Sequence, residues 1–244
     1  MKKYILSVDW DYFIDASALD RNMLFPDGGN ENLSSLVQDI IWANRYAYKD
    51  HNEDGKKISE IGIKSLECEL LIKLLQEQDS NIPICFAESH SDIYHFLTKV
   101  SNERDRFDIT NIDYHHDFYN TGSNLNCGNW LRILNKYNKL SKITWVCQED
   151  SDMDAIDKTK DLLNLSKTFS ISEIGVRKYD CVFICRSGMW SPPHLDKHFN
   201  YLIESIKEKQ SNIFSRTLFR EDRMIDIDGL IKQLKNVVNN INEV

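Results

Sequence analysis

The stretch YILSVDWDYF, residues 4–13, decides the fold class of this chain. Residues 4–8 form an apolar, β-prone run, and Asp9 and Asp11 follow it. A short apolar run that ends in carboxylates is typical of a buried parallel strand, because helices cover both faces of such a strand. The stretch therefore predicts an α/β protein whose functional groups lie at the carboxyl edge of a parallel sheet.

Four further runs have the same character, being short, apolar and bounded by polar residues. They span residues 82–87, 107–112, 143–147 and 181–185. Segments with helical spacing of apolar residues lie at 33–48, 63–78, 91–100, 128–137, 153–163, 194–209 and 227–241. Because strands and helices alternate, we expect a three-layer α/β/α fold with a mainly parallel central sheet.

The remaining stretches, residues 15–32, 51–57 and 212–224, are predicted to be irregular. None is rich enough in Pro or Ser for a linker, and we find no internal repeat. The 244 residues suffice for one continuous core, so we predict a single domain over residues 1–244.

The formal net charge of −8, with dispersed Lys and Arg, argues against a nucleic-acid-binding surface. The apolar run before Asp9 is too short for a signal peptide, and no later stretch approaches about 18 uncharged apolar residues, so we expect neither a signal peptide nor a membrane span. The six cysteines form no C-x-x-C pair and lie mostly in apolar runs. They are typical of buried free thiols, and we predict a cytoplasmic protein.

Acidic residues and histidines concentrate at three predicted strand ends. Asp9 and Asp11 share one side of an extended chain, where two carboxylates repel each other unless a cation or proton lies between them. His90 follows the run 82–87 at a strand-to-helix turn, where a parallel sheet exposes its site. These positions make all three residues candidates for a metal centre.

The third cluster follows the run 107–112. Asp113, His115 and Asp117 are spaced by two residues, on one face of an extended segment. With the first three residues they offer four carboxylates and two imidazoles, a donor set suited to Mn²⁺. A structural zinc needs only four ligands, whereas six with bridging carboxylates fit two ions roughly 3.5–4 Å apart.

Each cluster also has a structural interpretation. Asp9 and Asp11 fit an ordinary strand end with a helix cap, and an isolated His90 more often makes hydrogen bonds than binds metal. The run from Asp113 to Asp117 has little structural purpose without a partner charge. We interpret the other histidines as structural or supporting: His51, His95, His116, His194 and His198.

The three clusters resemble motifs of the arginase superfamily, which contains agmatinases and other ureohydrolases and is distantly related to histone deacetylases. Its members carry D-A-H-x-D, G-G-D-H-S and S-x-D-x-D. The corresponding stretches here are Asp113-Tyr114-His115-His116-Asp117, Ser89-His90-Ser91 and Ser7-Val8-Asp9-Trp10-Asp11. The resemblance implies an arginase-like fold and two Mn²⁺ ions.

The resemblance also implies a role for each ligand. Asp113 and Asp9 would bridge both ions. His90 and Asp117 would complete one coordination sphere. His115 and Asp11 would complete the other.

The order of the motifs differs from that in arginases, where S-x-D-x-D comes late in the chain. The fold is thus expected to be circularly permuted, which leaves a site intact if the old termini were close together. The D-W-D-Y-F opening is similar to an atypical arginase-like family that includes peptide arginases. Those enzymes convert arginine side chains of ribosomally made precursor peptides to ornithine. The similar motifs lie within residues 7–128.

Residues 122–128 (GSNLNCG) resemble the arginase loop S-G-N-L-H-G, which contacts the amino-acid end of the substrate and carries a histidine implicated in proton transfer. Here Asn126 or Cys127 takes the place of that histidine. We take Asn124 and Asn126 as candidate substrate contacts. The candidates for holding a cationic substrate are acidic residues near strand ends: Glu88, Asp92, Glu149 and Asp150.

Residues 186–194 (RSGMWSPPH) follow the run 181–185. The glycine, the tryptophan and the paired prolines predict a rigid loop over the site, with Trp190 as a further candidate contact. The alternative is a plain strand-to-helix connection with Pro193 near the helix start.

The reaction implied by the resemblance is hydrolysis of a guanidino group. Two Mn²⁺ ions would activate water toward the guanidinium carbon, and Asp117 would relay a proton to the leaving amine. Urea and ornithine would leave. The expected partner is an arginine-containing precursor peptide or a small guanidino compound, without a nucleic acid or a membrane.

Three other functions stay open. Asp9 and Asp11 also resemble the nucleophile and acid of haloacid-dehalogenase-like phosphatases, which use one Mg²⁺, but that interpretation leaves four of the six residues unexplained. A deacetylase-like amide hydrolase would use fewer ligands around one zinc. The third alternative is a non-catalytic metal-binding protein, and the absence of the loop histidine is an observation in its support.

Overall fold

The computed structural model describes residues 1–25, 33–49, 57–152 and 164–215, together with Arg223, Gly229 and Lys232. The predicted helix at 153–163 lies outside the described residues, as does the irregular stretch 51–57 except for its last residue. Of the predicted helix at 227–241, only Gly229 and Lys232 are described, and both are helical.

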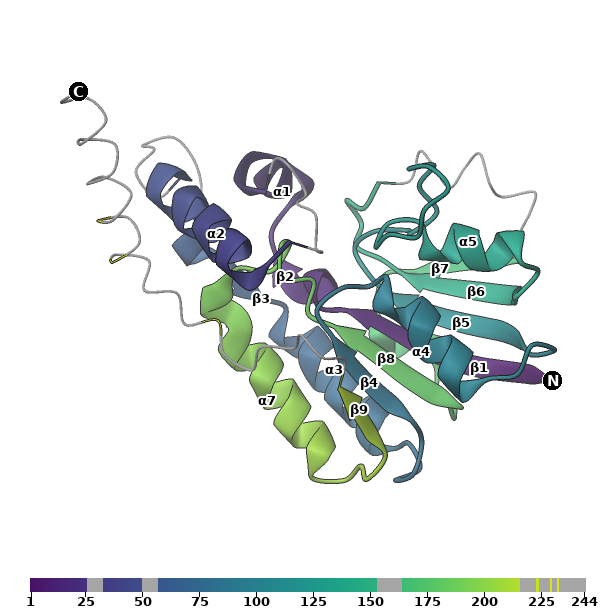
Figure 1. The fold of residues 1–244 in the computed structure, drawn as a ribbon. Coiled ribbons are helices and arrows are strands. Elements are labelled where there is room, and N and C mark those ends of the chain that lie inside the picture. The colour runs from purple at the N-terminus through teal and green to yellow at the C-terminus, as the bar shows by residue number, and fades with distance from the viewer. Residues whose placement is uncertain are drawn as a thin grey trace.

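Seven parallel strands form the central sheet, and helices cover both of its faces (Figure 1). The strand order is β7-β6-β5-β1-β8-β4-β9, and every pairing is parallel. The strands are β1 (Lys2–Asp9), β4 (Ile84–Ala87), β5 (Arg106–Ile112), β6 (Leu140–Val146), β7 (Leu165–Thr168), β8 (Cys181–Cys185) and β9 (Ile213–Ser215). The chain is therefore a three-layer α/β/α protein, as the sequence predicts.

Six helices of the described residues have α geometry, namely α1 (Ala18–Leu24), α2 (Ser35–Lys49), α3 (Ser65–Gln76), α4 (Asp92–Val100), α5 (Trp130–Lys136) and α7 (Asp196–Lys207). Short 3-10 turns lie at η1 (Trp10–Phe13), η2 (Ile58–Glu60), η3 (Ile171–Ile174) and η4 (Pro193–Leu195). A small antiparallel pair joins β2 (Ile14–Asp15) to β3 (Gly62–Ile63).

Two predictions of irregular structure are wrong in part. The stretch 15–32 contains α1, which begins with a capping box in which Ser17 and Asp20 satisfy each other's backbone N–H groups. The stretch 212–224 contains β9, which pairs with β4 at the edge of the sheet. The sequence also gives no sign of β7, because residues 165–168 (LSKT) are mostly polar on this opposite edge.

The sheet divides most of the core into two large apolar clusters, one on each face, and Trp145 and Cys147 form a small third cluster. Leu6 and Val8 of β1 pack in one cluster with side chains of α3 and α7, such as Leu71 and Phe199. Ile5 of β1 packs in the other cluster, with side chains of α4 and α5. Because β1 contributes to both clusters, it is buried on both faces, and its polar groups lie at its end.

The ends of the central strands are level with one another. In the register of the sheet, Val8 of β1 is paired with Ile112 of β5, so Asp9 and Asp113 leave their strands side by side. Cys185 of β8 is paired with both Asp9 and Ala87. The segments that end at residues 9, 87, 112 and 185 therefore meet at one point of the carboxyl edge.

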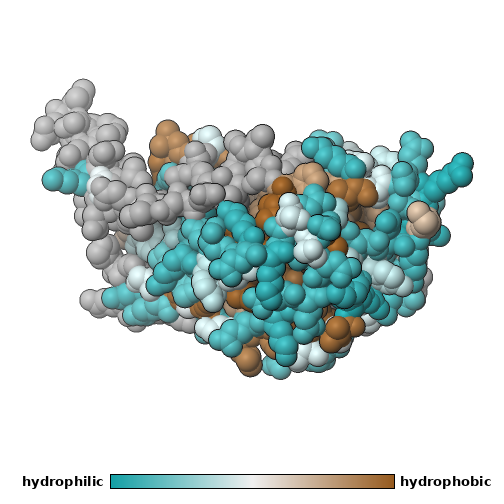
Figure 2. Space-filling view, turned by 90° about the horizontal axis from the view of Figure 1, so that it is seen from below, coloured by the Kyte–Doolittle hydropathy of each residue, from teal (hydrophilic) through white to brown (hydrophobic). Residues whose placement is uncertain are grey.

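All six cysteines are free thiols, and five of them are buried, whereas Cys127 is partly exposed. Seen from below, the described surface is mostly hydrophilic, with hydrophobic residues in small groups (Figure 2). Among the described residues, no helix is both long and apolar enough to cross a membrane.

Candidate metal centre

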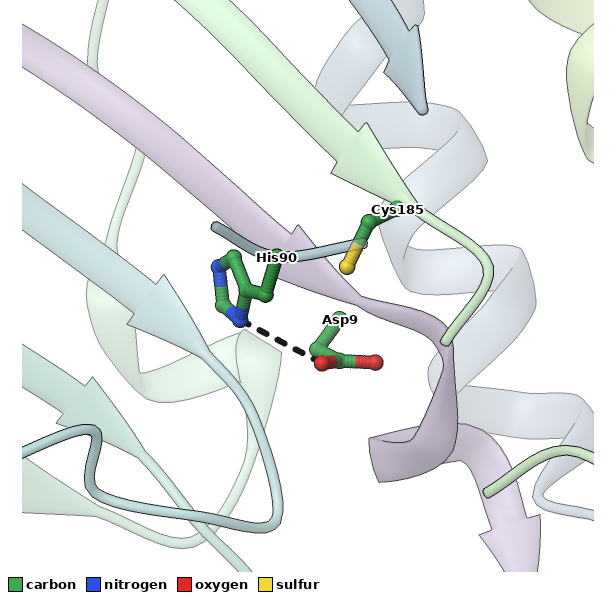
Figure 3. A group of neighbouring side chains, drawn as sticks. All are labelled: Asp9, His90 and Cys185. Carbon is green, nitrogen blue, oxygen red and sulfur yellow. Dashed lines mark ion pairs between the residues drawn. The ribbon is translucent and has the colours of Figure 1, made fainter. Parts of the chain in front are cut away.

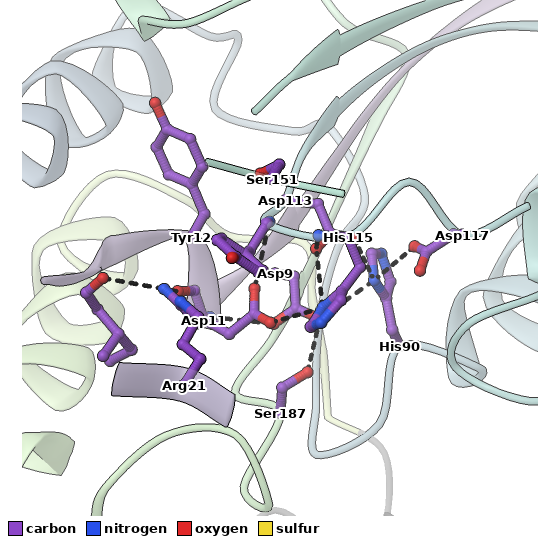
Figure 4. Close-up of polar contacts among 12 residues, drawn as sticks. Asp9, Asp11, Tyr12, Arg21, His90, Asp113, His115, Asp117, Ser151 and Ser187 are labelled. Atoms are coloured by element: carbon purple, nitrogen blue, oxygen red, sulfur yellow. Dashed lines mark hydrogen bonds and ion pairs between the residues drawn. The ribbon is translucent and has the colours of Figure 1, made fainter. Parts of the chain in front are cut away.

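The six predicted ligands come together at the carboxyl edge of the sheet (Figure 4). Asp9 ends β1, Asp11 lies in the turn η1, and the others follow β4 and β5. Five of these side chains are at most 7% exposed, whereas that of His115 is 22% exposed. Polar groups of this kind are costly to bury without a partner charge, so their convergence indicates a cation site.

One group of ligand atoms surrounds His90. Its Nδ1 lies 3.1 Å from Oδ2 of Asp117 and 3.2 Å from Oδ2 of both Asp9 and Asp113. A single N–H cannot serve three carboxylates with good geometry. The arrangement is typical of four donors around one positive charge.

A second group joins Asp11, Asp113 and His115. Nδ1 of His115 lies 2.9 Å from Oδ2 of Asp11, which is buried and accepts no hydrogen bond of good geometry from any described residue. An imidazole nitrogen and a carboxylate oxygen that face each other in this way fit a shared divalent cation.

Asp113 belongs to both groups. Its Oδ2 lies 3.2 Å from Nδ1 of His90, and its Oδ1 lies 3.9 Å from Nδ1 of His115. The carboxylate is held in place because Oδ1 accepts from the backbone N–H of His115 at 2.7 Å and Oδ2 accepts from Asn111 at 3.2 Å. Its two oxygens therefore face two different histidines.

Hydrogen bonds with buried side chains outside the ligand set orient these ligands. The Ser7 hydroxyl lies 2.7 Å from Nε2 of His90 and can accept a hydrogen bond from it, which leaves the lone pair of Nδ1 for a cation. The indole N–H of Trp130 donates to Oδ2 of Asp117 at 2.5 Å. The hydroxyl of Ser187 donates to Oδ2 of Asp9 at 2.6 Å.

Backbone strain is concentrated at this site. Of the described residues other than glycine, three have positive φ: Asp117 (55°), Asn138 (53°) and Ser187 (49°). Asparagine and aspartate adopt the left-handed region more readily than most residues, but serine does not. Ser187 donates to Asp9 of the cluster, and strained residues of this kind tend to occur at functional sites.

The electrostatics of the cluster also favour a cation. Burial and the neighbouring Asp9 raise the pKa of Asp11 to about 6. Burial, followed by the charge of Asp113, raises the pKa of Asp117 well above its usual value. The raised pKa values of Asp11 and Asp117 mean that negative charge on these two carboxylates is unfavourable without added positive charge, so a divalent ion fits this site.

The pKa values of the two histidines also rise, whereas the pKa of Asp113 falls. Burial opposes the charged form of His90, but the carboxylates, Asp117 foremost, outweigh burial and raise its pKa well above the usual value. The same balance, with Asp11 as the main partner, raises the pKa of His115. Burial likewise opposes ionisation of Asp113, yet the hydrogen bond from His90 lowers its pKa. In the absence of a cation, protons thus neutralise part of the cluster.

Cys185 lies beside the predicted ligands, and sequence reasoning assigned it no role. Its thiol forms a possible ligand group with Asp9 and His90 (Figure 3). The side chain is fully buried at the end of β8. Its position in an apolar run predicted only a buried thiol, and the strand register alone brings it to the site.

Of the predicted substrate contacts, Trp190 lies next to the ligand cluster, whereas Glu88 and Asn126 are bonded to other groups. The Trp190 ring lies 4.8 Å from the His115 ring, next to the cluster. Glu88 is instead in an ion pair with Arg186. Asn126 is bonded within its own loop, because its amide oxygen accepts from Gly128 N at 3.1 Å and its amide nitrogen donates to Thr121 at 2.9 Å.

The remaining candidates are exposed or half-buried. Asn124 is exposed, and its carbonyl accepts from Asn129 at 2.8 Å. Glu149 and Asp150 are exposed, and Asp150 accepts from the backbone N–H of Ala18 at 2.5 Å. Asp92 is half-buried in the first turn of α4.

Two of the histidines interpreted as structural have clear supporting contacts. Nδ1 of His116 accepts from the backbone N–H of Phe118 at 2.9 Å, and burial lowers its pKa to about 4. His194 lies between the Tyr46 hydroxyl at 2.5 Å and the Ile61 carbonyl at 2.9 Å. His51 lies outside the described residues.

The loop that follows β8 reaches the cluster through Ser187 and Trp190. Two side chains of α2 donate to carbonyls of this loop: Trp42 to that of Gly188 at 2.7 Å and Arg45 to that of Met189 at 2.7 Å. Pro193 begins η4 directly after it. The loop is therefore both a fixed support of the cluster and a strand-to-helix connection.

A buried ion-pair network anchors the same loop. Arg186 pairs with Glu88 and lies 3.2 Å from Asp196, which also pairs with Arg223 at 2.5 Å. Arg223 further donates to the carbonyls of Gly188 and Ser191. No sequence motif indicated this network, because its members lie in three distant segments.

No protein-family model, curated protein or solved structure matches this chain. The function is therefore inferred from the geometry and chemistry of the cluster.

Proposed function

We propose that this chain is a dinuclear metal hydrolase of guanidino groups, and that it converts peptidyl arginine to ornithine with release of urea. The observation that carries the proposal is the position of Asp113, whose two oxygens face His90 and His115 in two adjoining ligand groups. A carboxylate shared in this way is the means by which two-metal hydrolases hold their ions close together.

The donor set supports manganese as the metal. Carboxylates and imidazoles suit Mn²⁺, and four carboxylates supply enough negative charge for two dications. Asp9, with His90 and Asp117, completes the group on one side of Asp113, and Asp11 with His115 completes the other. The proposal thus uses all six side chains of the cluster.

Two bound dications would supply Lewis acidity that activates water and polarises the guanidinium carbon. Asp117 is the group that would hold and move the proton, at its carboxylate oxygens. It is buried, has a raised pKa and is oriented by the Trp130 indole. A carboxyl group of this kind is suited to take a proton from water and give it to a leaving amine.

The hydrogen bonds of Asp9 favour a ligand role over that of a phosphatase nucleophile. Its Oδ1 accepts from the backbone N–H of Asp11 at 3.1 Å, and its Oδ2 accepts from Ser187 at 2.6 Å. A nucleophilic carboxylate needs an oxygen that is free to attack, whereas a ligand is stabilised by such donors.

A urea-release assay tests the proposal. Protein reconstituted with Mn²⁺ would be incubated with an arginine-containing peptide, free arginine and agmatine, beside the isosteric variant Asp117→Asn. We expect urea from the peptide with the wild type and a loss of at least 100-fold with the variant, within the usual range for a general acid–base group, about 10²–10⁴. Bound metal without urea from any guanidino compound would refute the reaction and favour a non-catalytic metal protein.

A further inference from the structure

The cluster reaches solvent at His115, its most exposed ligand. Aromatic rings pack around that imidazole, with centroid distances of 4.8 Å to Trp190, 5.1 Å to Tyr114 and 6.5 Å to Tyr119. Tyr114 is buried, whereas Tyr119 and Trp190 are half-buried. The pair formed by Tyr119 and Trp190, here named the collar, therefore lies where a ligand would approach His115.

We propose that the collar binds the cationic guanidinium group of the substrate against its aromatic faces and so determines specificity for that group. This inference rests on the proposed function. A planar guanidinium stacks well on Trp and Tyr rings, because the ring face carries negative charge density.

The chain already uses this contact next to the site. The guanidinium carbon of Arg21 lies 3.8 Å from the centroid of the Tyr114 ring, and that of Arg45 lies 4.7 Å from the Trp42 ring. Arg21 therefore occupies the Tyr114 ring, which leaves Tyr119 and Trp190 as the partly exposed rings beside His115.

Both rings of the collar are held in place. The Tyr119 ring packs on His116 at 3.9 Å, and a Cβ at Gly128 would lie only 3.1 Å from its Cδ2. Gly128 thus leaves the space that the Tyr119 ring needs. The Trp190 backbone N–H donates to the Ser187 carbonyl at 2.8 Å, and the Trp190 side chain packs against the core cluster that contains Leu6 and Val8. Rings that are fixed before binding lose little entropy when a ligand stacks on them.

The contact that the collar offers a cation is the face of each aromatic ring. Glu88, the acidic contact that the sequence predicted, is paired with Arg186 and does not compete for this role.

Binding measurements on manganese-loaded protein test the inference in the Asp117→Asn background, where turnover of the arginine peptide is expected to be at least 100-fold lower. The probes are one short peptide with a central arginine and the same peptide with citrulline, which is neutral and nearly isosteric. In this background, calorimetry gives the ratio of their dissociation constants for the wild-type collar, Trp190→Leu, Tyr119→Leu, Trp190→Phe and Tyr119→Phe. The matched control is Tyr201→Leu, which removes an exposed ring from α7.

We expect each leucine variant to lower the preference for arginine over citrulline by about tenfold, the scale of one desolvated cation–π contact. The phenylalanine variants and the control should stay within about threefold of the wild type. Metal content should not change, because neither ring supplies a ligand. Leucine variants that keep both their metal and the wild-type preference would overturn the inference.

A second measurement does not depend on any variant being stable. Trp190 is the one tryptophan of five that is not fully buried. The arginine peptide should change the tryptophan emission of the wild-type protein, and the citrulline peptide at equal occupancy should not. Equal changes with both peptides, or none with either, would overturn the inference.

The two proposals fail separately. If the wild type releases no urea but its preference for arginine depends on the collar, the collar is a guanidinium site and the proposed reaction is wrong. If urea is released and the leucine variants keep the preference, the reaction stands and the collar has no such role.

Discussion

Ser187 offers a sharp test of how the protein prepares its ligands. The residue is fully buried, donates to Oδ2 of Asp9 at 2.6 Å and has a φ of 49°. Ser187→Ala removes the hydroxyl and keeps the strained backbone. Ser187→Gly removes the hydroxyl and also relieves the strain, since glycine adopts positive φ readily.

The two variants should bind metal equally weakly but differ in stability. A buried hydrogen bond to a carboxylate contributes about 1.5–3 kcal/mol, and losing a bond that orients a ligand lowers metal affinity about 10–100-fold. The left-handed backbone costs a side-chain-bearing residue about 1–2 kcal/mol, and the unfolded-state entropy of glycine offsets about half of that. Ser187→Gly should therefore be about 0.5–1 kcal/mol more stable than Ser187→Ala.

Metal affinity would be measured by competition with a chelator, and stability by urea denaturation of the metal-free proteins. The matched control is Ser191→Ala, because Ser191 is buried in the same loop and donates at 2.6 Å to the Arg186 carbonyl and not to a ligand. The control should keep wild-type affinity. The reasoning would be refuted if metal affinity varied with the stability of the three variants and not with the loss of the hydrogen bond to Asp9.

Three further predictions concern stability, pH and ligand orientation. Arg223→Met should lower the free energy of unfolding by about 3 kcal/mol, because it leaves the buried Asp196 carboxylate with Arg186 alone; a loss below about 1 kcal/mol in urea denaturation would contradict this. Metal-free protein should lose stability as the pH rises from 3.8 to about 6, because folded Asp11 keeps a proton that the unfolded residue has lost. Asp11→Asn should reduce that loss without abolishing it, because the pKa of Asp117 is raised as well, and an unchanged pH profile in denaturation would argue against it. Trp130→Phe should weaken metal binding about tenfold or more in a chelator competition. Trp145→Phe should not, since Trp145 donates to the backbone carbonyl of Asp113, and equal effects would contradict the role of the indole bond.

Much of the fold could be predicted because the central strands carry a strong signal. Runs such as residues 181–185 (CVFIC) are apolar throughout, since helices cover both of their faces. The edge strands β7 and β9 were missed because they lack this signal: an edge strand need not be apolar throughout. The helix α1 was missed because its signal is a local cap and not a long periodic pattern.

The ligand cluster could be proposed from the sequence because its residues lie at strand ends, and parallel strands bring their carboxyl ends together. The groups that orient the ligands could not be proposed in the same way. The position of the Ser187 hydroxyl depends on a left-handed backbone. Trp130 contacts Asp117 from the start of α5, 13 residues further along the chain. Cys185 and Arg223 come to the site only through the strand register and the ion-pair network. Such contacts depend on the tertiary packing, which a single sequence does not encode as a motif.

The most direct test of the two-metal site is the number of metal ions bound by the wild type and by Asp113→Asn. We predict that the purified wild type, equilibrated with Mn²⁺, holds two equivalents per chain by elemental analysis. Asp113→Asn should hold at most one, because the shared carboxylate joins the two ligand groups. A wild type that binds no more than one equivalent, or an Asp113→Asn variant that keeps two, would contradict the account.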